Sequence, residues 1–504
     1  MVGKAKSQGP HRRQWDVEDV TVTDLSSMRR SVTATAVGNF MEWYDFGLYA
    51  YLATVISQVF FPSDSSTTAG MLGTFVILAA SFIARPFGGL VFGPLGDRIG
   101  RRKVLAVTIL TMAVATTITG LLPGYADGGI WGDGIGVWAV VALLVTRLVQ
   151  GFSTGGEYVG AMIYLAEHAP DRRRGMLGGF LPLGTLLGFV VGAALVTGLT
   201  AGLSESAMLS WGWRIPFLLS GPLGIIALYM RLRMEETPAF EKMNEEQQDD
   251  KQSRSQQFRE TIIEQWPQLL VCVGLVLTFN LTNYMLTGYL PSYLQNIVKM
   301  SSTSALAIVT AVLVVLAIAV VFVARLSDIV SRKLIMSVGC GLLIVGAIPA
   351  FLLIHSGESY LIVFLGVLMV GLMLLGFNST EPSTVPTLFP TKVRYGSTAI
   401  AFNVSVAVFG GTTPLIAEGL ISATGDEMVP AYMLMFGGVV GIVSVYFTPE
   451  PSRRRLRGSG PIVSSDEEAN YVSRTGTIED PTKSETGLTE TEPGQEDRAR
   501  KTGV

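Results

Sequence analysis

Two acidic residues stand inside a long apolar stretch of this sequence, residues 32–61. Glu42 and Asp45, followed by Tyr49, are spaced at i, i+3 and i+7, so in a helix they share one face. If the stretch starts at a membrane surface, Glu42 lies about 15 Å deeper, close to the midplane. A charge at that depth costs roughly 3 kcal/mol or more. We therefore predict that this face handles protons or substrate, with an acid pinned by a structural cation as the alternative.

A basic residue and a further acid lie in a later apolar segment, residues 137–168. Arg147 is expected near mid-depth, where a buried guanidinium is expensive unless it meets an anion. Glu42 or Asp45 is the expected protein partner, and a substrate carboxylate is the expected ligand. A purely structural ion pair would give the same sequence pattern. Glu157 is a second acid in this segment, and we predict a role in proton coupling for all four residues.

The predicted solute site draws on aromatic and polar residues from both parts of the chain. Aromatic rings close to the two acids are able to surround a cationic ammonium head. For any single ring, packing or contact with lipid is the alternative. The residues predicted to bind solute are Trp43, Tyr44, Tyr49, Asn280, Asn283 and Tyr284.

The apolar segments determine the fold class. The chain has 504 residues, of which 49% are hydrophobic and 15% charged, and this is too apolar for a soluble protein. Each segment is long enough to span as a helix, whereas β-barrel strands would be shorter and alternating. We predict an all-α polytopic membrane protein with twelve transmembrane helices. The predicted spans are 32–61, 70–95, 103–122, 137–168, 175–200, 213–231, 268–291, 304–324, 334–354, 360–388, 396–422 and 430–447.

Lysine and arginine residues predict the orientation. Basic connections alternate with connections that contain neither residue, and Lys299 is the exception. Basic loops are retained on the cytoplasmic side. Both termini are therefore predicted to be cytoplasmic, in a multi-pass protein of the inner (plasma) membrane.

A polar stretch rich in Gln, Glu and Asp divides the spans into two groups of six. Repeated six-helix halves are typical of a rocking transporter whose site lies between them. After the last span the chain is rich in Ser, Thr, Glu, Gly and Pro, a composition typical of disorder. The predicted units are a cytoplasmic segment 1–31, an N-terminal six-helix bundle 32–231, a central cytoplasmic loop 232–267, a C-terminal six-helix bundle 268–447 and a disordered cytoplasmic tail 448–504.

A glycine-rich, charged loop follows the second span at 93–103, and a related sequence follows the eighth span at 324–333. The glycines permit a tight turn, and a carboxylate stands beside arginines. We predict an inter-helix latch, with a basic loop that only sets topology as the alternative. The second copy is eroded, because Ile329 replaces an arginine of the first. The predicted gating residues are Gly93, Asp97, Arg98, Arg101, Arg102 and Asp328.

This loop resembles the cytoplasmic loop motif of the major facilitator superfamily, which steadies one end state of an alternating-access cycle. Further segments resemble the metabolite:proton symporters of that superfamily, and among them the proline/glycine betaine carriers. The resemblance implies a twelve-helix fold and uptake of zwitterionic compatible solutes (proline, glycine betaine, ectoine) with protons, raised under osmotic stress. The segments that carry it are 38–46, 151–158, 211–217, 236–240, 284–286 and 389–395.

A basic cluster follows the last span and consists of Arg453, Arg454, Arg455 and Arg457. Basic residues beside a membrane attract anionic lipids by about 1 kcal/mol per charge. We predict that these arginines bind anionic lipid and regulate the carrier, with a purely topological role as the alternative. The tail has no apolar heptads, so a coiled coil is not predicted.

Other functions are judged by what the sequence lacks. It contains no phosphate-binding glycine loop, metal-ligand cluster or nucleophilic triad, so we predict no enzyme, no cofactor, no metal and no nucleic-acid partner. Proton symport of di- or tricarboxylates such as 2-oxoglutarate or citrate would need more buried cations than Arg85 and Arg147. Arg85 is also able to pair with an acid inside the spans. A transport-inactive membrane sensor is a third possibility, but it would not need these buried charges.

Overall fold

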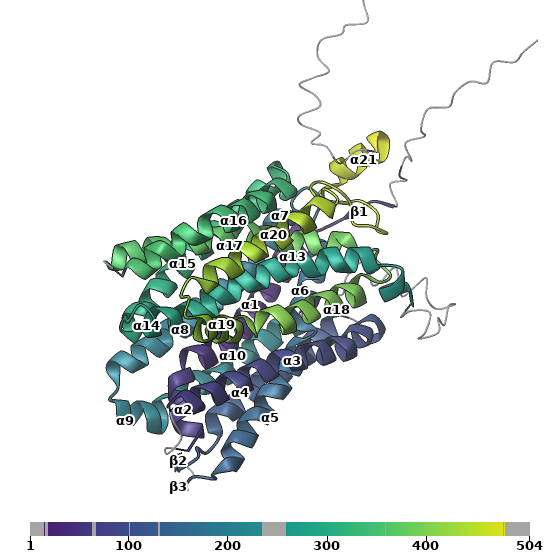
Figure 1. Cartoon of the computed structure of the whole chain (residues 1–504). Coiled ribbons are helices and arrows are strands. Elements are labelled where there is room, and N and C mark those ends of the chain that lie inside the picture. Colours follow the sequence, from purple (N-terminus) through teal and green to yellow (C-terminus); the bar gives the residue numbers. More distant parts are fainter. Residues whose placement is uncertain are drawn as a thin grey trace, which may run out of the picture.

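The computed structural model describes residues 15, 19–62, 67–99, 101–129, 132–233, 259–357, 359–476 and 478. This part of the chain is a bundle of long helices (Figure 1). Strand β1 (Thr21–Val22) and helix α21 (Asp466–Thr475) lie at one end, which we call the terminal end. The opposite end, the far end, carries a short antiparallel pair, β2 (Asp127–Gly129) and β3 (Gly132–Asp133), and helix α9 (Glu205–Ala207).

Eleven helical segments of the described chain are long and apolar enough to cross a membrane. Helix α1 (Leu25–Tyr51) is not among them, although its 27 residues are enough to span. It contains two arginines in its first turns, then Glu42 and Asp45, and these charges lower its hydropathy. With α1, the described chain has twelve segments long enough to span, as predicted.

In the first half several spans are built from more than one helix, because glycines or short irregular turns interrupt them. The remaining elements are α2 (Ala53–Phe60), α3 (Thr67–Ile99), α4 (Arg101–Leu121), α5 (Val137–Thr154), α6 (Glu157–His168), α7 (Arg174–Gly178), α8 (Phe180–Gly202), the π-helix η2 (Met208–Gly212) and α10 (Arg214–Leu232).

In the second half π-helical turns interrupt the seventh and eleventh spans, a feature that often marks functional positions. The predicted central loop falls mostly outside the described residues. The elements are the π-helix η4 (Arg259–Ile263), α13 (Trp266–Tyr284), the π-helix η5 (Met285–Tyr289), α14 (Leu290–Asn296), α15 (Ser302–Ile329), α16 (Arg332–Ser356), α17 (Tyr360–Thr384), the 3-10 helix η6 (Val385–Leu388), α18 (Arg394–Ser405), the π-helix η7 (Val406–Gly410), α19 (Thr413–Thr424) and α20 (Val429–Phe447).

Small residues allow the closest helix contacts. Helix α1 packs along α8, and α3 packs along α5. A Cβ atom on Gly188 would meet the backbone of Phe40, and one on Gly151 would overlap the backbone of Ser81. The two halves meet along the pairs α8–α15 and α3–α18. The site that the sequence predicts between the halves would lie along this seam.

The tail differs from its predicted disorder as far as residue 476. Strand β4 (Ile462–Val463) pairs in parallel with β1, and α21 follows with Ser465 as its N-cap. Asp171 fixes this segment twice: its N–H donates to the Ile462 carbonyl (2.9 Å), and its carboxylate accepts from the Ile462 N–H (3.1 Å). The composition suggested disorder because the stabilising contacts come from distant parts of the chain. Residues 479–504 lie outside the described part.

Candidate functional site

A cavity of about 110 Å³ lies between the two halves. Its walls come from α1, α2, α3 and α8 on one side and from α13, η5, α14, α15 and α19 on the other. The helices α2 and α14 are close to the far end (Figure 1). Among the described residues, no charged side chain lines this cavity. Its principal lining residues are the aromatic Trp43, Phe46, Phe82, Phe189 and Tyr284 and the polar Thr287, Ser292, Gln295 and Asn296.

Aromatic rings from both halves meet at the cavity wall. The Trp43 ring centroid lies 5.4 Å from that of Phe189 and 6.1 Å from that of Tyr284. Tyr284 is also in edge contact with Phe82, at 5.2 Å. The Trp43 indole N–H donates to Asn39 (3.1 Å), so the ring is held in place. Rings arranged in this way present π-faces that attract a cation.

Glu42 lies behind this wall, inside the first half, and it is paired with Arg85. The guanidinium Nη2 of Arg85 is 2.7 Å from Glu42 Oε1, and its Nε donates to Thr154 (3.0 Å). The Arg85 guanidinium also lies 4.6 Å above the ring of Phe46. The other Glu42 oxygen has no hydrogen-bond partner. Glu42 is one of the two acids expected to pair with Arg147. It pairs with Arg85 instead, which agrees with the expectation that Arg85 is able to pair with an acid inside the spans.

Asp45 accepts hydrogen bonds from two hydroxyl groups, those of Thr116 (2.8 Å) and Ser220. Arg147 is close enough to interact with it electrostatically but forms no ion pair with it within 4.0 Å. Instead Arg147 donates to Gln150 (2.5 Å) and its guanidinium lies 4.3 Å above the Tyr49 ring. Arg147 is only 1% exposed, and its Nε and Nη2 have no hydrogen-bond partner. A buried cation with unused donors costs several kcal/mol, so this site has capacity for an anion or a moving proton.

Glu157 lies apart from Asp45 and Arg147 and pairs with Arg231. The Arg231 Nη2 atom is 2.9 Å from Glu157 Oε1, and Thr108 donates to the other oxygen (2.7 Å). Arg231 stands at the end of α10, where the sequence indicated only a topological charge. Its role as a buried counter-ion could have been found only from the helix packing.

The predicted solute residues fall into two groups. Trp43 and Tyr284 line the cavity. Tyr44 and Tyr49 point into the first half, where their hydroxyls donate to the carbonyls of Pro216 and Thr74 (both 3.0 Å). Neither tyrosine lines the cavity in this conformation, because both hydroxyls are used in hydrogen bonds within the first half.

The remaining predicted solute residues are the two asparagines of α13. Asn280 donates to the carbonyl of Val276 (2.9 Å) in its own helix. Asn283 is buried, and its amide nitrogen has no hydrogen-bond partner. Asn283 therefore has both amide donors available for a ligand, whereas Asn280 has used one of its two.

At the terminal end the two halves are joined through Asp328. Its two carboxylate oxygens accept from the backbone N–H groups of Gly175 and Met176, at 2.7 Å each. Arg332 lies 3.0 Å from the same carboxylate. The eroded second copy of the loop motif thus forms the cross-half contact in this structure. We call this contact and those of the following paragraph the terminal gate.

Further cross-half contacts complete the terminal gate. Arg394 pairs with Glu167 at 2.8 Å, and Tyr395 and Asn403 donate to the carbonyls of Gly156 (2.9 Å) and Gly155 (2.6 Å). At the same end of the first half, burial raises the pKa of the Asp171 carboxyl, and the positive charge of the adjacent Arg174 acts to lower it. The gate is closed, and the cavity lies on its far-end side.

The first copy of the loop motif is mostly helical. Gly93, Asp97 and Arg98 belong to α3, and Arg101 begins α4, so the predicted turn is shorter than expected. Their side chains and Gly100 lie outside the described part. Arg102 donates to the carbonyl of Leu232 (2.5 Å) and so joins α4 to the end of α10.

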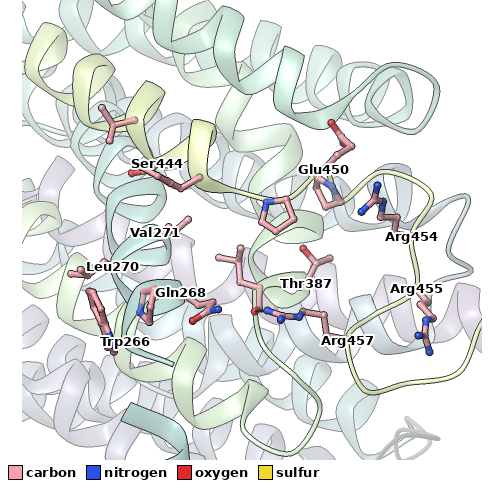
Figure 2. A pocket seen from close by; sticks show the side chains of 16 residues that line it. Trp266, Gln268, Leu270, Val271, Thr387, Ser444, Glu450, Arg454, Arg455 and Arg457 are labelled. Carbon is pink, nitrogen blue, oxygen red and sulfur yellow. Dashed lines mark hydrogen bonds between the residues drawn. The ribbon is translucent and has the colours of Figure 1, made fainter. Parts of the chain in front are cut away.

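The predicted basic cluster is divided between two surroundings. Arg453 donates to the Asp328 carbonyl (3.0 Å), next to the terminal gate. The other three arginines line a groove of about 820 Å³. Figure 2 shows Arg454, Arg455 and Arg457 on one side of this groove and Trp266 and Leu270 on the other.

Comparisons with known proteins agree with this architecture. The pattern of the family described as "Sugar (and other) transporter" matches residues 31–458. The chain belongs to this family. It is a multi-pass membrane transporter with the fold of the major facilitator superfamily, and it is not an enzyme.

Relatives and solved structures support the assignment. The chain is 41% identical over 461 residues to the glycine betaine/proline/ectoine/pipecolic acid transporter OusA of Dickeya dadantii (strain 3937) and to the proline/betaine transporter of Escherichia coli (strain K12), covering 90% of each chain. The putative proline/betaine transporter of Staphylococcus aureus (strain COL) is 39% identical. A structure of the proton:xylose symporter XylE has a TM-score of 0.71 at 17% identity, over 86% of this chain and 98% of that one. The resemblance seen in the sequence is confirmed.

Proposed function

We propose that this transporter is a proton-coupled symporter that imports zwitterionic compatible solutes such as proline, glycine betaine and ectoine. The observation that carries this proposal is the cavity between the halves, which is aromatic and polar and is lined by no charged residue of the described chain. A solute without net charge suits such a site, because a net-charged ligand would be buried without a counter-charge.

The two ends of a zwitterion find different partners in this cavity. Trp43, Phe82 and Tyr284 offer π-faces to a secondary or quaternary ammonium group. Ser292 and the amide of Asn296 offer hydrogen-bond donors to a carboxylate. The printed names of the relatives refer to solutes of this class.

Proton coupling is assigned to the acids behind the cavity wall. Asp45 accepts hydrogen bonds from two hydroxyl groups and interacts electrostatically with Arg147, but it forms no ion pair. Protonation of Asp45 therefore breaks no ion pair. A neutral carboxyl is cheaper to bury than a carboxylate, which links proton entry to rocking of the halves. Glu42, held by Arg85, is the second candidate.

The distribution of basic residues supports an orientation with both termini in the cytoplasm. In this orientation the terminal gate faces the cytoplasm, and the cavity faces the outside of the plasma membrane. The groove beside Arg454, Arg455 and Arg457 then lies at the inner membrane surface. Its exposed apolar wall, which includes Trp266 and Leu270, fits the acyl chains of an anionic lipid whose head group meets the arginines. Regulation by osmotic stress is proposed through this contact.

The proposal is tested with purified protein in vesicles. Uptake of radiolabelled proline, glycine betaine and 2-oxoglutarate is measured with and without an inward proton gradient. We expect gradient-dependent uptake of the zwitterions and none of 2-oxoglutarate. Uptake of 2-oxoglutarate alone would support the dicarboxylate alternative, and absence of any uptake would support a sensor.

The coupling residue is tested by Asp45→Asn. This variant keeps the hydrogen bonds of a neutral carboxyl but cannot release a proton, so its uptake should no longer respond to the gradient. A full response of this variant would remove Asp45 from the mechanism.

A further inference from the structure

A buried acid in the second half, Glu381, has a role in none of the contacts described so far. It lies near the end of α17 and is 0% exposed. The Tyr158 hydroxyl of α6 donates to its Oε2 atom at 3.4 Å, and its Oε1 atom has no partner. Within the described chain Glu381 forms no ion pair within 4.0 Å. It differs in this from Glu42 and Glu157, each of which is paired with an arginine.

The surroundings of Glu381 contain polar groups without charge. Asn378 and Thr384, three residues before and after it on the same face of α17, each have a buried polar atom without a hydrogen-bond partner. The titratable groups that interact with it are the Tyr158 hydroxyl and the thiol of Cys272 on α13. A carboxylate in this place would be a buried charge with one long hydrogen bond and no counter-ion, so the neutral carboxyl is the form that fits.

The contact between Tyr158 and Glu381 crosses the seam between the halves. Tyr158 lies two residues after Gly156, and Gly155 and Gly156 accept hydrogen bonds from Asn403 and Tyr395 of the second half. The Tyr158 ring also stacks on Phe402 at 4.9 Å. When the halves separate at the terminal end, these contacts break together and water reaches the carboxyl.

We propose that Glu381 is the carboxyl from which the transported proton leaves on the terminal side. This inference rests on the proposed symport. With the terminal gate closed, Glu381 holds a proton on its carboxyl group. When the gate opens, that O–H bond breaks, the proton passes to water and a hydrated carboxylate remains.

Reprotonation follows from the reverse movement. When the gate closes again, the carboxylate returns to a site without a counter-ion, which drives it to take up one proton. Tyr158 joins the two sides, because its hydroxyl donates to Glu381 and its ring is in edge contact at 6.3 Å with Trp43, which is next to Glu42 in the chain. One proton is gained and one is lost in each cycle.

The test compares net uptake with exchange in vesicles. Exchange of labelled for unlabelled solute needs no proton release, whereas uptake driven by a proton gradient does. Glu381→Gln should slow gradient-driven uptake relative to exchange by about tenfold or more. The control is Glu418→Gln, which changes an exposed acid on α19 and should leave this ratio unchanged. A Glu381→Gln carrier with the wild-type ratio would overturn the inference.

A second variant covers the case in which Glu381→Gln does not fold. Tyr158→Phe removes the hydrogen bond that favours the charged carboxylate, so the pH dependence of coupled uptake should move up by about one pH unit. An unmoved curve would contradict the role of Glu381. If uptake by the wild-type carrier does not respond to a proton gradient, the proposed symport fails. This result differs from one in which Glu381→Gln has the wild-type ratio of gradient-driven uptake to exchange, which contradicts only the role of Glu381.

Discussion

At the scale of single residues, the interior charges are balanced in different ways. Glu42 has Arg85, Glu157 has Arg231, and Asp45 has two hydroxyl donors. An ion pair between two helices fixes those helices against each other. An acid with neutral donors is able to change its protonation state at lower cost. Of the two acids proposed for proton coupling, Asp45 is therefore favoured over Glu42, which is paired with Arg85.

The pair of Glu42 and Arg85 gives a stability prediction. Arg85→Met leaves a buried carboxylate without a cation and should lower the free energy of unfolding by about 3–5 kcal/mol. The double variant Glu42→Gln with Arg85→Met should recover most of this loss. Thermal unfolding of the detergent-purified protein measures both, with Arg233→Met at an exposed site as control. Equal stabilities of the single and double variants would show that the two residues are not coupled.

The cavity wall gives a binding prediction. Trp43→Ala removes a ring worth about 1–2 kcal/mol of cation–π attraction, so binding of glycine betaine should weaken about tenfold, whereas Trp43→Phe keeps most of the affinity. Titration calorimetry measures the dissociation constants, and Trp211→Ala, at a residue 47% exposed, is the control. Equal effects at Trp43 and Trp211 would argue against the proposed cavity as the solute site.

At the scale of elements, glycines decide which helices approach most closely. Helix α5 lies against α3 at Gly151, and no side chain fits there because the Ser81 backbone occupies the space. On α8, Gly198 has open space around its Cα. Both glycines lie within helices, but only Gly151 is in contact with the backbone of a neighbouring helix.

Alanine substitutions separate these two settings. Alanine favours a helix over glycine by about 1 kcal/mol, so Gly198→Ala should be neutral or slightly stabilising. Gly151→Ala forces α3 and α5 apart and should be destabilising by about 1–3 kcal/mol. The melting temperatures of the two purified variants provide the comparison. If Gly151→Ala proves as stable as Gly198→Ala, the close approach of α3 and α5 is not needed for stability.

At the scale of the whole molecule, one end of the bundle holds the two halves together. The terminal gate joins them through Asp328, Arg394 and Tyr395. The segment that follows α20 crosses the same surface: Arg174 donates to the Arg454 carbonyl (2.8 Å), and Arg457 donates to the Leu388 carbonyl (2.9 Å). The tail therefore contacts both halves in the gate-closed conformation.

Truncation tests whether the folded part of the tail regulates transport. Ending the chain after Arg457 removes β4 and α21, including the two hydrogen bonds between Asp171 and Ile462, worth about 1–3 kcal/mol together. The osmotic threshold of uptake should change more than the solute concentration for half-maximal rate. Uptake in vesicles at stepped external osmolality measures both quantities. The matched control ends after Gly476 and keeps α21; identical thresholds in the two truncations would refute a regulatory role of β4 and α21.

The sequence by itself determined where the membrane-spanning helices lie and that the protein is an all-α membrane protein. Span positions agree with the structure to within a few residues for most helices, because a lipid-spanning helix is recognisable from a local property, its length of apolar sequence. Trp43 and Tyr284, which line the cavity, were also selected by local cues, namely aromatic residues beside polar groups in the spans. The two-half organisation followed from the repeated loop motif at 93–103 and 324–333.

Only the tertiary structure decided which charges meet. Arg85 rather than Arg147 pairs with Glu42, Tyr44 and Tyr49 turn away from the cavity, and the tail folds on Asp171 as far as α21. Each of these depends on the rotation of one helix against another, and residues that are far apart in the chain set that rotation. Sequence spacing defines the face of a helix on which a side chain lies, but only packing determines what stands opposite that face.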